Sequence, residues 1–217
     1  MLYLHTSKSS RIGSRNIWMR PFEQNLEEIL HTLNVCKRCN INGIYVEAFY
    51  NGDIPGKSNI TDTNKEVING YYGEVYKNDY LKAFISEAHK LNIEVHAWVE
   101  CFFIGEKSNQ WKKHYKDEWH LINYDGSNVQ GNNPEKNEND FIWLDPANPE
   151  CLDYVLSIYK ELITNYEFDG LNLDYVRYPH GNYDIKYSSG YTNYAMNEFK
   201  KIITIEEPIE YQMSHLQ

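Results

Sequence analysis

The chain has 217 residues, and its hydrophobic content of 41% is typical of a globular protein with one large or two small domains. Its formal net charge is −10 and no segment is rich in Lys and Arg, which argues against nucleic acid or an anionic membrane surface as a partner. No apolar segment has the length of a membrane span, and residues 1–14 lack the apolar core of a signal peptide, so the default expectation is a cytoplasmic protein.

The first part of the chain predicts a strand, a helix and a second strand. Residues 17–20 form the first strand, which Pro21 ends. In the helix that follows, Asn25 and Glu28 have the three-residue spacing of a capping pair. Residues 43–49 alternate as the second strand, and a long polar loop comes after it.

The order of helix and strand then repeats, with predicted elements at residues 81–91, 94–101, 149–163, 170–174 and 191–202. A second long loop, from about residue 104 to 148, contains a short strand-like segment at 141–144. Asn148 has the position of a cap residue in front of Pro149, which begins the third helix.

Alternating strands and helices predict an α/β fold with a parallel sheet and outer helices. A complete (β/α)₈ TIM barrel needs about 250 residues, whereas about four βα units can be identified here. We therefore expect a partial barrel that comprises the first four βα units over residues 15–205, with an N-terminal extension at 1–14 and a tail at 206–217. Its first and last strands would be open edges, which predicts a homo-oligomer or a missing second half-barrel as partner.

The cysteines do not predict a metal site. Cys36 and Cys39 form a C-x-x-C pair, but it lies in a helical pattern and no second pair or histidine pair has metal-ligand spacing. We expect reduced thiols and no cofactor.

Acidic residues at the carboxyl ends of the strands are the candidates for chemistry. Residues 170–174 predict a buried strand, in which Leu171 and Leu173 point to one face and Asn172 and Asp174 to the other. Both long loops follow strands, so they belong to the same edge of the sheet, which is the functional face of a barrel. Asp174 is the polar residue at this edge and the first candidate for catalysis.

Glu47 and Glu100 are candidate partners of Asp174, because glycoside hydrolysis needs two carboxyl groups with separated pKa values. Each has a structural alternative: Glu47 pairs with Arg20 or Arg177, and Glu100 caps its strand.

Asp145 and Asp169 also have structural interpretations. Asp145 precedes Pro146 and has the position of an Asx-type turn, while Asp169 begins its strand at the opposite edge of the sheet.

The predicted substrate-binding residues lie near the same strand ends: Arg177, Tyr178, His96, Trp98, Asn172, Asp145, Tyr50 and Trp119. Arg177 and Tyr178 could orient Asp174 or bind substrate hydroxyls. For His96 the alternatives are a core residue and, in a metal-dependent hydrolase, a ligand that acts with Asp174.

Five segments resemble the glycosyl hydrolase-like 10 family. The segments EAHKLNIEVHAWV (87–99), WLDPANPE (143–150) and DGLNLDYVRYP (169–179) are similar to three of its signatures, and IWMRP (17–21) and NINGIYVE (40–47) are similar to its first two strand regions. The matches run in order over residues 15–180. Many members of this family look secreted, whereas this chain shows no signal.

The resemblance implies a TIM-barrel glycoside hydrolase that acts on a bacterial cell-wall or extracellular polysaccharide. A more distant similarity is to the α-amylase clan, in which Asp174 would hold the nucleophile position, although Asn172 stands where that clan has Arg. The alternative is a non-catalytic carbohydrate-binding or vestigial half-barrel, in which Trp111, Trp119 and Tyr124 stack on sugars without hydrolysis.

Overall fold

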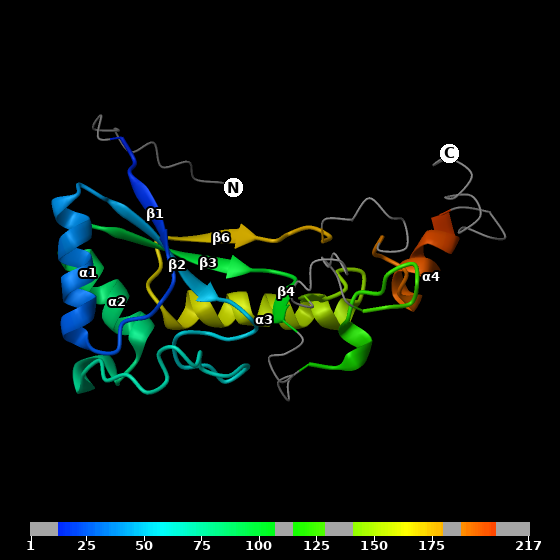
Figure 1. The fold of residues 1–217 in the computed structure, drawn as a ribbon, viewed down its shortest axis with the longest axis horizontal. Helices are drawn as coiled ribbons and strands as arrows, with labels where there is room; N and C mark the ends of the chain where they lie inside the picture. The colour runs from blue at the N-terminus through cyan, green and yellow to red at the C-terminus, as the bar shows by residue number, and fades with distance from the viewer. Residues whose placement is uncertain (1–12, 107–114, 129–140, 180–187, 203–217) are drawn as a thin grey trace, which may run out of the picture.

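A parallel sheet of four strands forms the centre of the molecule (Figure 1). The computed structural model describes residues 13–106, 115–128, 141–179 and 188–202. The strand order is β1 (Asn16–Met19), β2 (Gly43–Phe49), β3 (Glu94–Glu100) and β6 (Gly170–Asp174), and each neighbouring pair is parallel. The prediction of an α/β fold with a parallel sheet is confirmed.

Three helices connect these strands and cover one face of the sheet: α1 (Leu26–Arg38), α2 (Tyr80–Lys90) and α3 (Pro149–Asn165) (Figure 1). Alternate residues of β3 explain this arrangement, since Val95, Ala97 and Val99 are fully buried against the helices. His96 and Trp98 point to the other face and are only half-buried. A period of two therefore divides the sheet into a covered face and an open face.

The predicted helix caps are confirmed. Asn25 Oδ1 accepts the Glu28 backbone N–H at 2.9 Å, and Glu28 Oε2 accepts the Gln24 backbone N–H at 2.7 Å. Asn148 Oδ1 likewise accepts the Glu150 N–H at 3.0 Å at the start of α3. These side chains satisfy backbone donors that the first helical turn leaves without partners.

The second long loop contains more strand than its sequence predicts. β4 (Phe103–Glu106) pairs antiparallel with β5 (Phe141–Trp143), so the strand-like segment at 141–144 is confirmed and β4 was missed. We call this antiparallel pair the β4–β5 hairpin, although residues 107–140 separate its two strands in the sequence. Its register is irregular between Phe103 and Gly105, and the φ of Gly105 is +103°. Such a bulge interrupts the alternation by which a strand is recognised.

The first long loop carries a short 3₁₀ helix, η1 (Glu74–Tyr76), and the second carries η2 (Asp117–Trp119). The last helix, α4 (Asn193–Ile202), lies beyond the carboxyl ends of the strands and away from the sheet (Figure 1). The predicted extension and tail fall almost entirely on residues 1–12 and 203–217, outside the described part of the chain. Among the described helices, none combines the length and apolar character that crossing a membrane requires.

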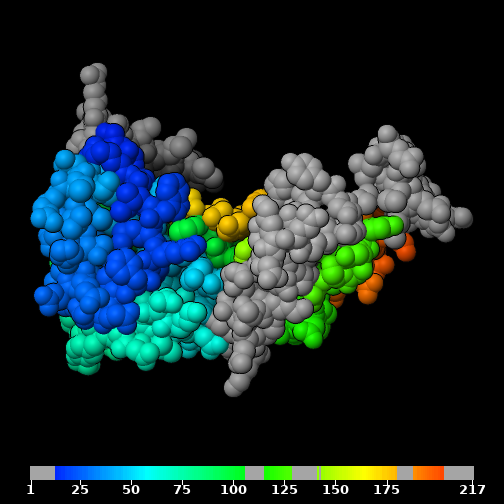
Figure 2. Space-filling view, viewed as in Figure 1, coloured from blue at the N-terminus to red at the C-terminus, as the bar shows by residue number. Residues whose placement is uncertain are grey.

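The fourth strand is not buried as predicted. Leu171 and Leu173 are 36% and 49% exposed, because β6 pairs only with β3 and no described helix covers its outer side. Figure 2 shows this part of the chain, in gold, at the surface of the face in view.

Asp169 connects the amino edges of two strands, as predicted. Its Oδ2 accepts the Val95 backbone N–H at 2.7 Å and lies 2.9 Å from His89 Nε2 at the end of α2. We expect Asp169→Ala to lower the free energy of unfolding by about 1–3 kcal/mol, since it leaves the Val95 donor without its partner. Urea denaturation measures this, with Glu167→Ala at a neighbouring exposed carboxylate as control; equal losses in the two variants would contradict the assignment.

Candidate active site

Three of the predicted carboxylates lie at the carboxyl edge of the sheet, on its open face. Glu100 and Asp174 are direct partners in the register of β3 and β6, and Glu47 is the partner of Trp98 one step back along β2 and β3. Adjacent parallel strands are about 4.8 Å apart, so the Glu100 and Asp174 side chains leave the sheet as neighbours. The sheet therefore brings together the residues that the sequence suggested for catalysis.

Asp174 is held through both of its oxygens. The Trp98 indole Nε1–H donates to Oδ2 at 2.9 Å, and the Tyr175 backbone N–H donates to Oδ1 at 2.7 Å. Tyr175 has a φ of +52°, a left-handed conformation that costs a residue other than glycine about 1–3 kcal/mol. Both oxygens of Asp174 therefore accept an N–H, which holds the carboxyl group in one orientation.

Glu47 is fully buried and has a different environment. Arg20 Nε forms an ion pair with Glu47 Oε2 at 2.9 Å, and neither Glu47 oxygen has a well-aligned hydrogen bond among the described residues. Burial raises the pKa of the Glu47 carboxyl to about 7, against the opposing effect of Arg20. Burial prevails because the Arg20 side chain is 61% exposed and water screens its charge. Of the two partners suggested for Glu47, the structure selects Arg20.

Glu100 is also buried, and its contacts are few. The Asn51 backbone N–H approaches Glu100 Oε2 at 3.4 Å. Burial first, and then the neighbouring Glu47 charge, raises the pKa of the Glu100 carboxyl to about 8. Glu100 is therefore protonated at neutral pH, the form in which a carboxyl group can donate a proton.

Tyr50 joins this cluster through a bulge in β2. The register shifts between Glu47 and Phe49, so one extra residue lies opposite β3. Without the bulge, Glu47 and Tyr50 would point to opposite faces, because they are three residues apart. With it, both contact Arg20, whose guanidinium lies 5.0 Å from the centre of the Tyr50 ring.

Arg177 and Tyr178 follow the strand end, but Arg177 forms no ion pair with a carboxylate among the described residues. Its guanidinium lies over the rings of Trp143 and Tyr175, at 5.2 and 5.0 Å, and it donates to the Tyr178 carbonyl at 3.1 Å. The suggestion that Arg177 orients Asp174 is therefore wrong for this structure. Substrate binding by Arg177 and the half-exposed Tyr178 stays a prediction.

Trp119 and Asp145 do not fit their predicted substrate-binding roles. Trp119 is 7% exposed and its indole N–H donates to Glu150, so its ring is not open to a sugar. Asp145 is fully buried; its oxygens accept from the Ala147 N–H and the Thr192 hydroxyl. The turn alternative for Asp145 is confirmed. Trp111 lies outside the described residues.

His96 lies far from the carboxylates, deeper in the sheet. Its partner in β6 is Gly170, four residues before Asp174, which corresponds to about 13 Å along a strand. The His96 ring instead packs 5.0 Å from Tyr45, which stacks on Trp18 at 4.8 Å. A metal site made of His96 and Asp174 is therefore wrong, and the described residues contain no group of three or more acidic, His or Cys side chains arranged to bind a metal. The four cysteines are free thiols.

Asn172 and Trp98 are register partners on the open face, one layer below Asp174. The indole N–H of Trp98 is used by Asp174, so this predicted substrate-binding residue contacts the candidate catalytic group directly. Tyr175 was missed by the sequence analysis, since no residue pattern indicates that its backbone turns left-handed and directs its N–H to Asp174.

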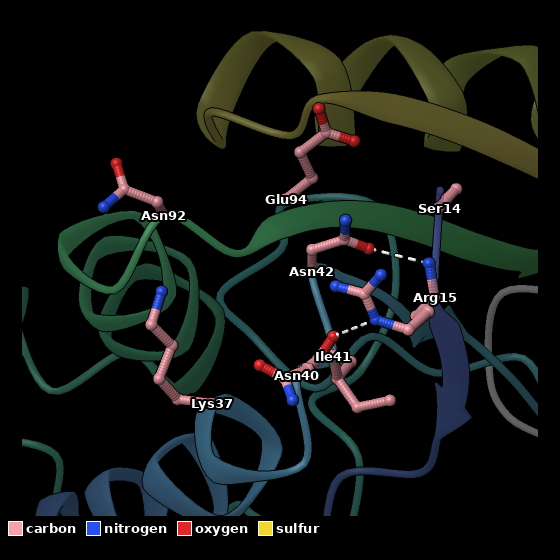
Figure 3. Close-up of a pocket in the computed structure, with 8 residues that line it drawn as sticks. All are labelled: Ser14, Arg15, Lys37, Asn40, Ile41, Asn42, Asn92 and Glu94. Atoms are coloured by element: carbon pink, nitrogen blue, oxygen red, sulfur yellow. Dashed lines mark hydrogen bonds between the residues drawn. The ribbon is translucent and has the colours of Figure 1, made fainter. Parts of the chain in front are cut away.

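A hollow of about 490 Å³ lies at the opposite, amino edge of the sheet (Figure 3). Its polar groups bond mainly to one another: the Arg15 backbone N–H donates to Asn42 at 2.7 Å, and Lys37 Nζ donates to the Leu91 carbonyl at the end of α2. These bonds tie the helix ends to the strands, and we assign this edge a structural role.

Comparison with known proteins identifies the family of the chain. The sequence matches the glycosyl hydrolase-like 10 family over residues 13–210. The chain belongs to this family. Among curated proteins it is similar to the glycosyl hydrolase DigH of Escherichia coli K12, with 24% identity over 148 residues, and to the glycosyl hydrolase YngK of Bacillus subtilis, with 24% identity over 139 residues.

The chain covers only part of these relatives. The match to DigH takes in 68% of this chain and 34% of DigH, and the match to YngK takes in 63% of this chain and 26% of YngK. The family supports a glycoside hydrolase-like role for the chain.

Solved structures show a shared fold. A hypothetical protein from Ruminiclostridium thermocellum superposes with a TM-score of 0.55 at 21% identity, covering 86% of this chain and 90% of that one. A cycloisomaltooligosaccharide glucanotransferase from Paenibacillus superposes with a TM-score of 0.51 at 15% identity, covering 88% of this chain and 28% of the glucanotransferase.

Proposed function

We propose that the carboxyl edge of this sheet is a glycoside hydrolase active site, in which Asp174 is the nucleophile or stabilising anion and Glu100 the acid/base. The observation that carries the proposal is the contrast between these two neighbours. Asp174 receives two N–H donors, whereas Glu100 is buried with one long contact and a pKa raised to about 8. Hydrolysis of a glycosidic bond needs such a pair, one carboxyl group ionised and the other protonated.

Glu47 supports this pair from the next strand. Its ion pair with Arg20 and its unpartnered Oε1 suit a residue that orients a substrate hydroxyl or adjusts the charge beside Glu100. Glu47 is the second candidate for the acid/base.

The substrate that we propose is a bacterial cell-wall or extracellular polysaccharide. Both curated relatives are named glycosyl hydrolases, and the exposed open face carries rings suited to sugars. Trp18, for example, is 59% exposed on this face.

We further propose that the four strands are the first four of a TIM barrel and that additional strands cover the outer edges of β1 and β6. Each of these strands has one described neighbour in the sheet, and Leu171 and Leu173 are exposed beside it. Open edges with exposed apolar residues call for cover. A second copy of the chain or further polypeptide of the same kind could provide it.

Release of new reducing ends from a panel of bacterial glycans tests the hydrolase proposal. We expect turnover by the wild-type chain and none by Asp174→Asn. Equal turnover by the two proteins would remove Asp174 from the mechanism.

The exposed β6 edge favours a second candidate function, a non-catalytic carbohydrate-binding half-barrel. Calorimetry with the same glycans distinguishes the two. Binding without turnover over several days would favour the second function, and robust turnover by the monomer would exclude it.

A further inference from the structure

We propose that Trp98 is a positioning residue for Asp174, and that the β4–β5 hairpin helps to position Asp174 by holding Tyr175 in its left-handed conformation. This inference rests on the proposed function for the role of Asp174 in turnover. Its structural part, a clamp of two N–H donors around one carboxylate, can be tested without activity.

The first donor comes from the centre of the sheet. Trp98 lies on β3, between Glu47 on β2 and Asn172 on β6 in the register, so strands on both sides fix its backbone. Its half-buried ring reaches along the open face and places Nε1 at 2.9 Å from Asp174 Oδ2. An indole nitrogen can only donate, so this contact recognises the oxygen of Asp174 as an acceptor.

The second donor depends on a strained backbone. With φ at +52°, the N–H of Tyr175 is directed to Asp174 Oδ1 at 2.7 Å. A residue with a side chain keeps this conformation only when its surroundings enforce it.

The surroundings of Tyr175 come from the hairpin that follows β3. The Tyr175 ring lies 5.4 Å from the ring of Phe103 in β4 and 5.3 Å from the ring of Trp143 in β5, with the Arg177 guanidinium over it at 5.0 Å. Phe103 and Trp143 also pack on each other at 5.5 Å. These rings anchor the Tyr175 side chain. The N–H lies in the peptide plane between Asp174 and Tyr175, and turning that plane would change the φ of Tyr175, so the anchored side chain restricts where the N–H points.

The two donors fix the plane of the Asp174 carboxyl group and leave its outward lone pairs for a reacting atom. If the side chain of a nucleophile rotates into another rotamer, its oxygen is no longer aligned with the reacting carbon and the reaction slows. Positioning residues prevent this rotation. Glu100, the register partner of Asp174, has no comparable clamp among its described contacts.

Trp98→Phe tests the first donor, because it keeps an apolar ring and removes the N–H. We expect kcat to fall by about 10- to 100-fold with little change in KM, the size of effect that a hydrogen bond to a charged group has. Trp119→Phe is the matched control: it also removes an indole N–H that donates to a carboxylate, here Glu150, and Trp119 makes no described contact with Glu47, Glu100 or Asp174. A loss in Trp98→Phe no larger than in the control would overturn the proposal.

The indole N–H resonance of Trp98 in isotope-labelled protein gives a readout that does not need turnover. We expect it to shift in Asp174→Asn, while the resonances of Trp18 and Trp119 stay in place. No shift at Trp98 would overturn the clamp. A shift at Trp98 in a protein that hydrolyses no glycan would leave the clamp standing and reject the proposed function.

Tyr175→Ala and Tyr175→Gly test the strained backbone, since both remove the ring but only glycine adopts a positive φ without strain. We expect Tyr175→Gly to retain several-fold more turnover than Tyr175→Ala and a Trp98 resonance closer to that of the wild type. Equal behaviour of the two variants would show that the conformation of Tyr175 does not position Asp174.

Discussion

Asp174→Asn is expected to lower turnover of the responsive glycan by on the order of 10⁴-fold, as does removal of a nucleophile or its essential partner in other hydrolases. Asparagine has the same shape and keeps one oxygen, which can accept from only one of the two donors, Trp98 or Tyr175. It lacks the negative charge that attacks or stabilises the oxocarbenium-like transition state. The fold should therefore stay intact while the chemistry is lost.

Two measurements make this result specific to the chemistry. Initial rates of reducing-end release give the loss, and binding of the same glycan by calorimetry should change by less than about threefold, because uniform binding is not affected. Asp153→Asn, at an exposed carboxylate in α3, serves as the control substitution. Retention of more than a tenth of the wild-type rate by Asp174→Asn would exclude Asp174 as the nucleophile.

Glu100→Gln is expected to lower activity and raise stability at the same time. Loss of a general acid costs about 10²–10⁴-fold in turnover. The stability effect follows from burial, which raises the pKa of Glu100 to about 8 in the folded protein from an ordinary value of 4.5. A neutral glutamine does not carry the penalty of a buried charge.

The sign of the pH dependence follows from proton binding. Between pH 4.5 and about 8 the folded protein holds a proton on Glu100 that the unfolded chain has lost, so its stability falls as pH rises. Above about pH 8 Glu100 ionises in the folded protein as well, so its contribution to stability no longer changes with pH. The free energy of unfolding of Glu100→Gln, relative to that of the wild type, should therefore increase by on the order of a few kcal/mol as the pH rises from 5 to 9.

Urea denaturation at several pH values measures this gain. Glu47→Gln is the informative comparison, because burial also raises the pKa of Glu47, to about 7, but its replacement breaks the ion pair with Arg20. We expect a smaller gain for Glu47→Gln. Identical pH dependence of stability in wild type and Glu100→Gln would show that Glu100 is not a buried, protonated group. The wild-type kcat/KM should also decline on the alkaline side with a pKa of about 8.

Local sequence patterns predicted much of this molecule because their physics is local. Alternation of apolar residues predicted β2 and β3, and capping side chains predicted where α1 and α3 begin. The order of strands and helices placed the strand ends at one edge, and with them the candidates Glu47, Glu100 and Asp174. Asp169 was correctly assigned to the other edge.

Contacts between distant segments decided the rest. The bulge in β2 places Tyr50 on the same face as Glu47, where it contacts Arg20. Simple alternation along the strand would place Tyr50 on the opposite face. Arg20 and not Arg177 pairs with Glu47, because β1 lies beside β2 while the rings of Trp143 and Tyr175 hold Arg177.

The residue types along the chain thus determined the class of fold, the helix caps and the strand ends at which the acidic groups stand, since each depends on neighbours within a few positions. Only the tertiary structure decided what each acidic group experiences. Asp174 acquires two donors, one from β3 and one from a backbone strained against the β4–β5 hairpin, while Glu100 is buried with few contacts. Burial and electrostatic environment sum over every segment that surrounds a group, so they arise only when the distant segments have packed together.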